Sequence, residues 1–359
     1  INIKNRYNNK TMISTHDNDI KLEFKNHGLT GLQNLGNTCF MNTAIHCISN
    51  TIPLTSYFLS NDYLQDLNED RKQFSFVKEW VRLLKVIWSN NCTISPNSFH
   101  EATQKLALEC KRDCFTGLQQ NDTQEFIQFF IDSLHEGLCK EVNIVISGKP
   151  LNQVDNMALE AMNVWKTHFK SSYSTIIDTF YGQYVSKIMS TEDNTDSSHQ
   201  YEPFCYLTLP IPNKNNIDLY DCFKCFCKTE HLTSGWESEK YNKNVKAVKQ
   251  IMFWSTPKIL IISINRYQIN KNQYTKKNCL INFPLQNLNL ENFCVGYDKY
   301  KSKYDLYGIC NHNGTINGGH YWCYIKNENG KWHKHNDEDV TIINEDNIIT
   351  SKAYCLFYK

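Results

Sequence analysis

A cysteine in the setting of a catalytic nucleophile lies early in the chain, within GLQNLGNTCFMN, residues 31–42. A thiol becomes a useful nucleophile when its pKa falls, and the N–H groups and dipole of a helix N-terminus favour the thiolate. Cys39 stands where a helix over residues 38–50 is expected to begin, with Thr38 placed to cap it. The preceding Gly/Asn turn can offer backbone N–H groups, or the side-chain amide of Asn34, to an oxyanion. A small buried core cysteine remains the alternative interpretation.

A histidine that could serve this thiol as a base lies much later. His320 follows Gly318 and Gly319 and begins the segment HYWCYIK, whose aromatic and β-branched residues predict a strand. The chain turns at NENG and returns as KWHKHNDEDV, which predicts a hairpin. A solvated surface hairpin is the plainer interpretation. The glycine pair argues against it, because the backbone before His320 is left bare for a substrate to approach.

The register of this hairpin decides which side chain can orient His320. A tight Asn-Gly turn would place His320 opposite Asp339. A four-residue turn would place it opposite Asp337, and a bulge would move it toward Asn336, so the register stays open. In every case His320 lies beside the polar run 336–339. One of these side chains can accept the Nδ1 proton of the imidazole, which is the role of the third member in cysteine hydrolases.

The first half of the chain is expected to carry these groups on helices. Apolar residues recur at helical spacing in residues 73–89, in a segment that starts behind Ser95-Pro96, and in residues 121–138. In the last of these, Asp122 is placed to cap the helix and Glu125 lies near its first turn, where a negative charge suits the dipole.

After about residue 175 the pattern changes to short aromatic and β-branched segments separated by Asn, Gly, Pro and Asp clusters. We expect an antiparallel sheet region there, interrupted by one helix at roughly 217–228 and by a solvated loop at 191–200. A helical half followed by a sheet half predicts an α+β fold. Residues 1–28 are polar and lack a clear period, so they are expected to form an N-terminal extension or a loosely attached arm.

The bulk composition narrows the class of protein. The 359 residues carry a net charge of +1, which gives no electrostatic case for binding nucleic acid or a membrane surface. Fifteen cysteines in so long a chain do not resemble a secreted disulfide scaffold. No charged-then-apolar leader opens the chain and no long apolar run occurs in it. We therefore expect an intracellular protein of the cytoplasm or nucleus with reduced thiols.

Three long segments resemble the sequence boxes of the ubiquitin-specific protease family. GLQNLGNTCFMN is similar to its Cys box, FTGLQQNDTQEFIQFFIDSLHE to its Gln-Gln-Asp box, and YDLYGICNHNGTINGGHYWCYIKNENGKWHKHNDEDV to its His box. PKILIISINRY is similar to the family's strand before the His box, and the matches are collinear over roughly residues 29–358. The resemblance implies a papain-like α+β fold in a catalytic domain of residues 29–359. Its helical thumb would span about 29–175, and its antiparallel fingers and palm about 176–359.

The resemblance also implies an activity, hydrolysis of the isopeptide or peptide bond after the C-terminal glycine of ubiquitin. Cys39 then matches the nucleophile, and His320 matches the general base that later acts as general acid. Asn336 falls where the family has the Asp or Asn that orients the histidine, and Asp337 matches an accessory polar group. Asn34 matches the oxyanion donor. A neutral Asn336 should stabilise the imidazolium less than a carboxylate would, so high turnover is not assumed.

A channel for the C-terminal tail of ubiquitin is implied by the same match. The residues expected to line it are Asp122, Gln124, Glu125, Tyr267, Gly319 and Tyr321. Since that tail carries arginines, carboxylates at positions 122 and 125 make physical sense. The helix-cap interpretation of Asp122 competes with this role, and both can hold.

The chain departs from the family at the fingers, which often bind one Zn²⁺ through two Cys-x-x-Cys pairs. The matching positions are Ser190, Asp193, Ser238 and Tyr241, so we expect no structural zinc and no other cofactor. The CFKC sequence of Cys222 and Cys225 has zinc-like spacing. It lies in a helical stretch with no second pair, and its apolar neighbours are typical of a core stripe.

Several alternatives to an active deubiquitinase stay open. A catalytically silent ubiquitin-binding scaffold of the same fold is disfavoured, because the chain retains both Cys39 and His320. A protease for a ubiquitin-like modifier is not excluded, because several such modifiers share a Gly-Gly end. Another papain-like acyl-transfer enzyme would need a different Cys neighbourhood. The expected partners are ubiquitin and its conjugates, and the need for an activating protein stays open.

Overall fold

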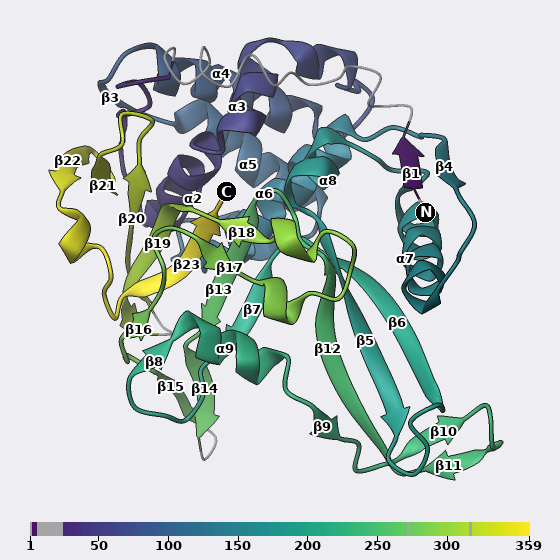
Figure 1. Ribbon diagram of the computed structural model, residues 1–359. Helices are drawn as coiled ribbons and strands as arrows, with labels where there is room; N and C mark the ends of the chain where they lie inside the picture. The colour runs from purple at the N-terminus through teal and green to yellow at the C-terminus, as the bar shows by residue number, and fades with distance from the viewer. Residues whose placement is uncertain (1, 6–23, 271–272, 316–317) are drawn as a thin grey trace.

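The computed structural model describes residues 2–5, 24–270, 273–315 and 318–359. Figure 1 shows a lobe of helices packed against a large sheet, from which a second sheet projects as a long arm. The helical lobe comes from the first half of the chain and both sheets from the second half, as the α+β prediction requires. The helices of the lobe are α2 (Cys39–Ser49), α3 (Ile52–Leu59), α4 (Phe74–Ser89), α5 (Asn97–Glu109), α6 (Thr123–Leu138) and α8 (Thr175–Phe180).

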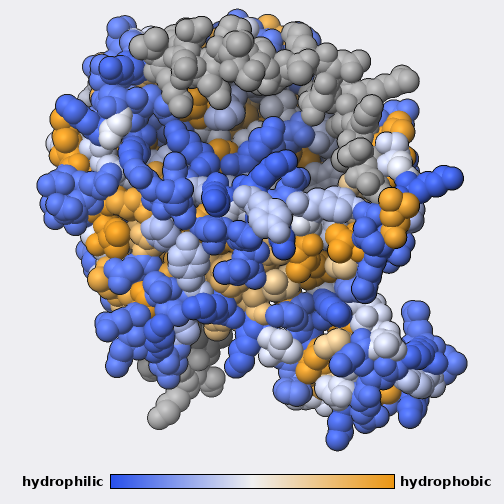
Figure 2. Space-filling view, in the orientation of Figure 1, coloured by the Kyte–Doolittle hydropathy of each residue, from blue (hydrophilic) through white to orange (hydrophobic). Residues whose placement is uncertain are grey.

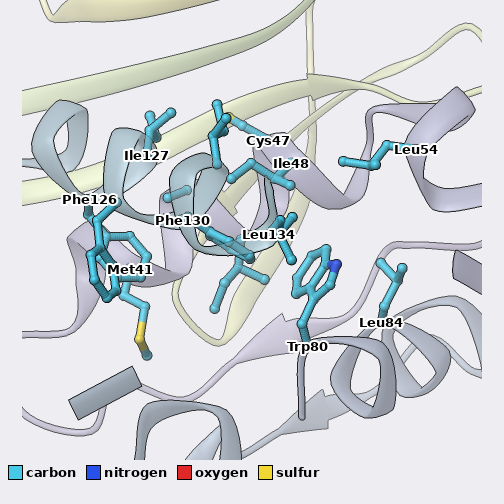
Figure 3. Packing of buried hydrophobic residues seen from close by; sticks show 14 of the residues in the cluster. Met41, Cys47, Ile48, Leu54, Trp80, Leu84, Phe126, Ile127, Phe130 and Leu134 are labelled. Atoms are coloured by element: carbon cyan, nitrogen blue, oxygen red, sulfur yellow. The ribbon is translucent and has the colours of Figure 1, made fainter. Parts of the chain in front are cut away.

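The core of the helical lobe is built from aromatic rings. Trp80 of α4 meets Phe130 of α6 edge-on, with ring centroids 4.8 Å apart. Phe76 lies 5.1 Å from Phe99 of α5. Figure 3 shows Trp80, Phe126 and Phe130 pointing into the same interior as Met41 and Ile48 of α2. Burial of these large rings contributes to the apolar driving force of the core against which α2 packs.

Helix α2 is surrounded by protein on every side, since all of its 11 residues are buried. Its predicted extent is confirmed, but its predicted cap is wrong. Thr38 occupies the N-cap position without capping the helix, and its Oγ1 instead accepts a hydrogen bond from the backbone N–H of Leu35 at 2.8 Å. In α6 the predicted cap is confirmed, because Oδ1 of Asp122 accepts from the N–H groups of Gln124 and Glu125 at 2.7 and 3.3 Å.

The large sheet has seven strands in the order β22-β21-β20-β19-β23-β13-β7. Its pairs are antiparallel except for β13 and β7, which run parallel, so the expectation of a wholly antiparallel region is wrong at this edge. The strands are β7 (Leu207–Pro210), β13 (Leu260–Asn265), β19 (Leu306–Thr315), β20 (Gly318–Lys326), β21 (Trp332–Asn336), β22 (Asp339–Ile343) and β23 (Ala353–Tyr358).

The projecting arm is a four-stranded sheet in the order β6-β5-β12-β9. Its strands are β5 (Gly182–Ser190), β6 (Ser197–Phe204), β9 (Glu230–His231) and β12 (Ala247–Ser255). Strand β6 corrects the predicted loop at 191–200, whose last four residues pair with β5. Helix α9 (Leu219–Phe226) confirms the predicted helix near 217–228, whereas α7 (Gln153–Phe169), which packs against the arm, was not predicted.

Shorter strands complete the fold. They are β2 (Gly31–Leu32), β3 (Thr93–Ile94), β8 (Ile217–Asp218), β10 (Trp236–Ser238), β11 (Lys243–Val245), β14 (Tyr267–Asn270), β15 (Gln273–Lys276), β16 (Ile281–Asn282), β17 (Leu288–Asn289) and β18 (Lys303–Tyr304). Of these, β14 and β15 form a two-stranded ribbon beside the large sheet, and β10 and β11 form another at the end of the arm.

Two parts of the expected N-terminal extension are attached to the domain. Strand β1 (Asn2–Asn5) pairs antiparallel with β4 (Ile144–Ser147). Phe24 is buried against Trp88, with ring centroids 4.8 Å apart. The description as a loosely attached arm is therefore wrong for residues 2–5 and 24–28. The boundary drawn at residue 28 stays a prediction.

Candidate active site

Cys39 is the first residue of α2 and is only 4% exposed. Burial raises the pKa of its thiol above the ordinary value, and the nearby carboxylate of Asp337 raises it further. Backbone hydrogen bonds from Tyr321 and Phe40 oppose this rise. The backbone N–H groups of Phe40 and Cys39 at the start of α2 do lower this pKa, as expected, but desolvation outweighs them in the free protein and the net shift is upward.

His320 lies on β20, where its ring contacts the side chain of Asn336. Its Nε2 is 2.6 Å from Oδ1 of Asn336, so the amide oxygen accepts the Nε2 proton. The predicted orienting bond was to Nδ1, and the structure corrects this. The neutral ring then carries its lone pair on Nδ1, which is left for proton exchange with a thiol.

The thiol and the imidazole are not yet hydrogen-bonded to each other. Among the hydrogen bonds of the residues that the structure describes, none joins Sγ of Cys39 to the ring of His320. The two groups nevertheless come from adjoining elements, because the backbone of Tyr321, the next residue after His320, hydrogen-bonds to Cys39. Hydrogen bonds of catalytic groups are often long in unliganded sites and tighten when substrate binds.

The β20–β21 hairpin has neither of the two turns considered from the sequence. Lys326 pairs with Trp332, and a three-residue turn follows in which the N–H of Asn327 donates to the carbonyl of Lys331 at 3.0 Å. Gly330 takes a φ of +80° there, which glycine adopts without steric cost. Strand pairing stops short of His320, so Asn336, at the end of β21, is free to turn toward it.

Asp337 links the turn between β21 and β22 to the segment around Cys39 by hydrogen bonds. It adopts a φ of +50° in the tight turn between β21 and β22. Its carboxylate accepts hydrogen bonds from Nδ2 of Asn34 at 2.9 Å and from Nδ2 of Asn42 at 2.8 Å. Its carbonyl accepts from the N–H of Leu32 at 2.8 Å. Asp337 thus lies beside the cysteine turn, and Asn336 is the group that contacts His320.

Asn34 is held in a defined orientation near the nucleophile. Its Oδ1 accepts from the N–H groups of Gly36 and Thr38 at 3.0 and 3.1 Å, which leaves its Nδ2 to donate. An amide nitrogen carries two hydrogens, of which Asp337 takes one. The other belongs to an exposed side chain and is available to an oxyanion.

The predicted channel residues differ in how free their polar groups are. Both oxygens of Asp122 are engaged, one in the α6 cap and the other by the hydroxyl of Tyr354 at 2.6 Å. Gln124 bonds Ser263 and Thr208 with its side chain. Glu125 is exposed, so its carboxylate is available to a basic tail.

The aromatic part of the predicted channel forms one cluster. The ring of Tyr321 is buried and stacks on His312, with centroids 4.3 Å apart. The hydroxyl of Tyr267 lies 3.2 Å from Nδ1 of His312. Tyr354 contacts both tyrosine rings at about 6 Å. Sequence reasoning missed His312 and Tyr354. The position of His312 inside the quoted segment YDLYGICNHNG was an available signal, whereas nothing in its local pattern marks Tyr354.

Gln120 is a further residue that sequence reasoning missed. Its Oε1 accepts the backbone N–H of Gly319 at 2.6 Å, and its Nε2 donates to Oδ1 of Asn37 at 3.3 Å. One side chain therefore links the turn before Cys39 to the glycine before His320. Its position inside the quoted segment FTGLQQNDTQEF was the available signal.

Comparison with known proteins identifies this architecture. The family model described as "Ubiquitin carboxyl-terminal hydrolase" matches residues 30–358. The chain belongs to the ubiquitin carboxyl-terminal hydrolase family. Its fold is the papain-like α+β fold of the ubiquitin-specific proteases, as predicted.

Individual relatives agree with the family match. The chain is 34% identical over 346 residues to ubiquitin carboxyl-terminal hydrolase 2 of Bos taurus. This match covers 92% of the present chain and 55% of the bovine protein. It is 30% identical over 356 residues to ubiquitin carboxyl-terminal hydrolase 21 of Rattus norvegicus, with 92% and 61% covered. The chain thus spans little more than half the length of these curated relatives.

A solved structure gives the same fold. It is described as "Structure of the SAGA Ubp8/Sgf11/Sus1/Sgf73 DUB module bound to ubiquitin aldehyde". The similarity has a TM-score of 0.75 and 25% sequence identity, and it covers 94% of this chain and 70% of that one.

Among the described helices, none combines the length and apolar composition that a bilayer crossing needs.

The family's zinc positions lie together at the end of the arm, which Figure 2 shows as a mostly hydrophilic knob at the lower right. The hydroxyl of Tyr241 and the ammonium of Lys240 both donate to Oδ2 of Asp193, at 2.7 and 2.6 Å. Ser238 donates to Oδ2 of Asp196 at 2.7 Å. Ser190 accepts from backbone N–H groups of the same loop.

This donor set does not fit a structural zinc site. Zinc in proteins takes thiolate, imidazole or carboxylate ligands, and Asp193 is the one such group among the four matching positions. Within the described ranges, no cluster of three or more His, Cys, Asp or Glu side chains is arranged to hold a metal ion. Cys222 of α9 is buried in the core with Phe223, whereas Cys225 and Phe226 are only partly buried, so the core-stripe interpretation holds for Cys222 alone among the three residues that it named.

A buried pair of histidines lies between helix α2 and strand β21. His46 of α2 and His335 of β21 are 4.2 Å apart between ring centroids, and both are nearly inaccessible. Burial lowers the pKa of His46 to about 3 and that of His335 well below its ordinary value, so both rings are neutral. The pair packs the catalytic helix against the strand that ends in Asn336.

Proposed function

We propose that this chain is a cysteine protease of the deubiquitinase class, which hydrolyses the isopeptide or peptide bond after the C-terminal glycine of ubiquitin. The observation that carries the proposal is the bond between Nε2 of His320 and Asn336, on the strands beside the N-terminus of α2 where Cys39 lies. The family match, and the ubiquitin aldehyde bound in the similar solved structure, support ubiquitin as the substrate.

The chemistry starts with proton transfer from the Cys39 thiol to Nδ1 of His320. The thiolate attacks the carbonyl carbon of the terminal glycine, and the tetrahedral oxyanion accepts hydrogen bonds from the free N–H of Asn34 and from backbone N–H groups. The imidazolium then gives its proton to the leaving amine as the C–N bond breaks. Water, deprotonated by the same imidazole, attacks the thioester and releases ubiquitin with a free carboxylate and the cysteine as a thiol.

The free enzyme must rearrange before this sequence can begin. Burial raises the pKa of Cys39, and the thiol has no hydrogen bond to His320. The imidazole must therefore reach Sγ, because a thiolate forms in this buried site only when the imidazolium arises beside it. A substrate tail lying between Gly319 and the cysteine turn meets Gln120 there, so its arrival also breaks the Gln120 contacts.

Reaction with ubiquitin that carries a C-terminal thiol-reactive group tests the proposed function. We expect a covalent adduct on the wild-type chain, detected by intact mass, and no adduct from matched probes built on other modifiers that end in Gly-Gly. If an adduct forms only with one of those modifiers, the proposed mechanism would stand, but that modifier would be the substrate in place of ubiquitin. Ubiquitin that binds without forming an adduct would instead favour a silent scaffold or an enzyme that needs an activator.

We also propose that the arm holds its shape without zinc. The contacts of Asp193 with Lys240 and Tyr241 support this, since they join the loops that two Cys-x-x-Cys pairs would join. We expect less than about one zinc per ten chains by elemental analysis, because only one of the four matching positions holds a side chain that binds zinc. Activity and melting temperature should be the same with and without a chelator. One tightly bound zinc per chain would contradict this.

A reducing compartment, the cytoplasm or the nucleus, is our proposal for where the chain acts. All fifteen cysteines are free thiols, and Cys92 and Cys114 are exposed among them. Exposed free thiols persist in reducing compartments.

A further inference from the structure

Lys276, at the end of β15, reaches across to the strand that pairs with the His320 strand. Its Nζ lies 2.7 Å from Nδ1 of His312, 3.1 Å from the carbonyl oxygen of His312 and 3.4 Å from that of Gly314. An ammonium carries three N–H donors, and three acceptors surround this one. Lys276 therefore contacts β19 both at a side chain and at its backbone.

The contact continues from His312 to the catalytic histidine through close packing. The ring of His312 lies so near Gly319 that a Cβ at position 319 would come within 2.4 Å of Nε2 of His312. The same ring stacks on Tyr321. His320 stands between these two neighbours, so the position of the His312 ring sets the position of the backbone that carries His320.

Backbone pairing gives a second connection. Asn313 on β19 pairs with His320 on β20, and Gly314 pairs with Gly319. A Cβ at Gly314 would lie 2.3 Å from the carbonyl oxygen of Gly318, so the two strands approach closely at this point. A displacement of β19 at residues 312–314 is therefore transmitted to His320.

We propose that Lys276 is a positioning residue for the hydrolytic reaction. Its ammonium fixes His312 and the end of β19, and through them it holds His320 where its Nδ1 can reach the Cys39 thiol. The inference rests on the proposed function, because it concerns the same reaction. Lys276 acts through His312 and the backbone of β19, without touching the reacting atoms.

The charge state of Lys276 makes the inference testable by pH. Partial burial, with the positive charges of Arg266 and Lys352, lowers the pKa of Lys276 to about 8, against a smaller raising effect of Asp122. As pH rises through this value the ammonium loses one of its three N–H donors, and the contact with β19 weakens. Among the residues that the structure describes, the titratable and charged groups around it are Arg266, Lys352, Asp122, Tyr267 and His312.

The hydrolysis rate should therefore fall above about pH 8, in addition to any other ionisation. The pKa of His312 is lowered to about 4 and that of Tyr267 is raised to about 12, so neither group changes charge in this range. His312 and Tyr267 therefore do not account for a loss of rate near pH 8, and the Lys276 variants show whether Lys276 does.

The test compares the full chain with Lys276→Met and Lys276→Arg, using a fluorogenic ubiquitin C-terminal amide from pH 6 to pH 10. Lys276→Met should lower kcat by roughly 10-fold or more at pH 7 with little change in KM, because a small misplacement of a catalytic group is costly. The rate of this variant should also no longer decrease as the pH rises through about 8. Lys276→Arg, whose guanidinium stays charged, should keep more activity and also lose that decrease. The neighbouring Lys277→Met serves as the control and should resemble the wild type.

The possible outcomes separate this inference from the proposed function. Hydrolysis by the wild-type chain tests the proposed function. The ratio of the variant rate to the wild-type rate tests the role of Lys276. Wild-type kcat in Lys276→Met, or a slow variant that still loses activity near pH 8, would overturn the positioning role. A wild-type profile that stays flat up to pH 10 would also overturn it.

Discussion

Replacement of Cys39 by alanine is expected to abolish hydrolysis of ubiquitin conjugates while leaving ubiquitin bound. No other thiol takes its place in the proposed mechanism, and loss of a nucleophile costs roughly 10⁴-fold or more in kcat. The fold should tolerate the change, because Cys39 contributes a small buried surface at the end of a helix whose other residues are all buried too. Hydrolysis and ubiquitin affinity would be measured by progress curves and by calorimetric titration.

The exposed Cys92 offers a matched control for this experiment. Cys92→Ala removes a free thiol at the surface and should leave both hydrolysis and affinity unchanged. Wild-type hydrolysis by Cys39→Ala would remove Cys39 from the reaction. Loss of ubiquitin binding in the same variant would show that the cysteine shapes the binding site as well.

Short-range sequence signals predicted the helices of the lobe well. The 3.6-residue spacing of apolar residues located α4 and α6 within a residue or two, because each buries one face against a common core. Asp122 capped α6 as its residue type suggests. The helix α7 was missed because only three of its residues, Ala158, Ala161 and Phe169, are buried, which leaves a weak apolar stripe.

The geometry around His320 could not be predicted in the same way. The register of the β20–β21 hairpin depends on a three-residue turn in which Gly330 has a positive φ, and several turns suit the sequence NENG equally well. Which nitrogen of His320 faces Asn336 depends on where β21 ends relative to β20. Both facts are properties of the assembled sheet.

The charge state of Cys39 illustrates the same limit. A helix N-terminus favours the thiolate, and this local rule was applied to the sequence. Burial of Cys39 and the proximity of Asp337, almost three hundred residues later, raise its pKa instead. The thiol of the free chain thus stays protonated, and in the proposed mechanism the proton is removed only when His320 approaches.

Asn336→Ala is expected to reduce kcat by roughly 10- to 100-fold without a matching change in KM, because His320 loses the acceptor that fixes its tautomer. In the wild type, Oδ1 of Asn336 keeps the proton on Nε2 and the lone pair on Nδ1. Without it the ring can rotate and carry its proton on either nitrogen. Asn336→Asp keeps an acceptor at the same distance and should retain activity, which separates the hydrogen bond from the packing of the side chain.

Asp337→Ala gives the decisive comparison, and we expect it to slow hydrolysis less than Asn336→Ala. Asp337 bonds Asn34 and Asn42, so its loss loosens the oxyanion donor. The same change removes a negative charge that raises the pKa of Cys39, which partly offsets the damage by favouring the thiolate. If Asp337→Ala proves far slower than Asn336→Ala, Asp337 must turn to His320 once substrate binds. The orienting role would then belong to the carboxylate, and Asn336 would only hold the ring in the free enzyme.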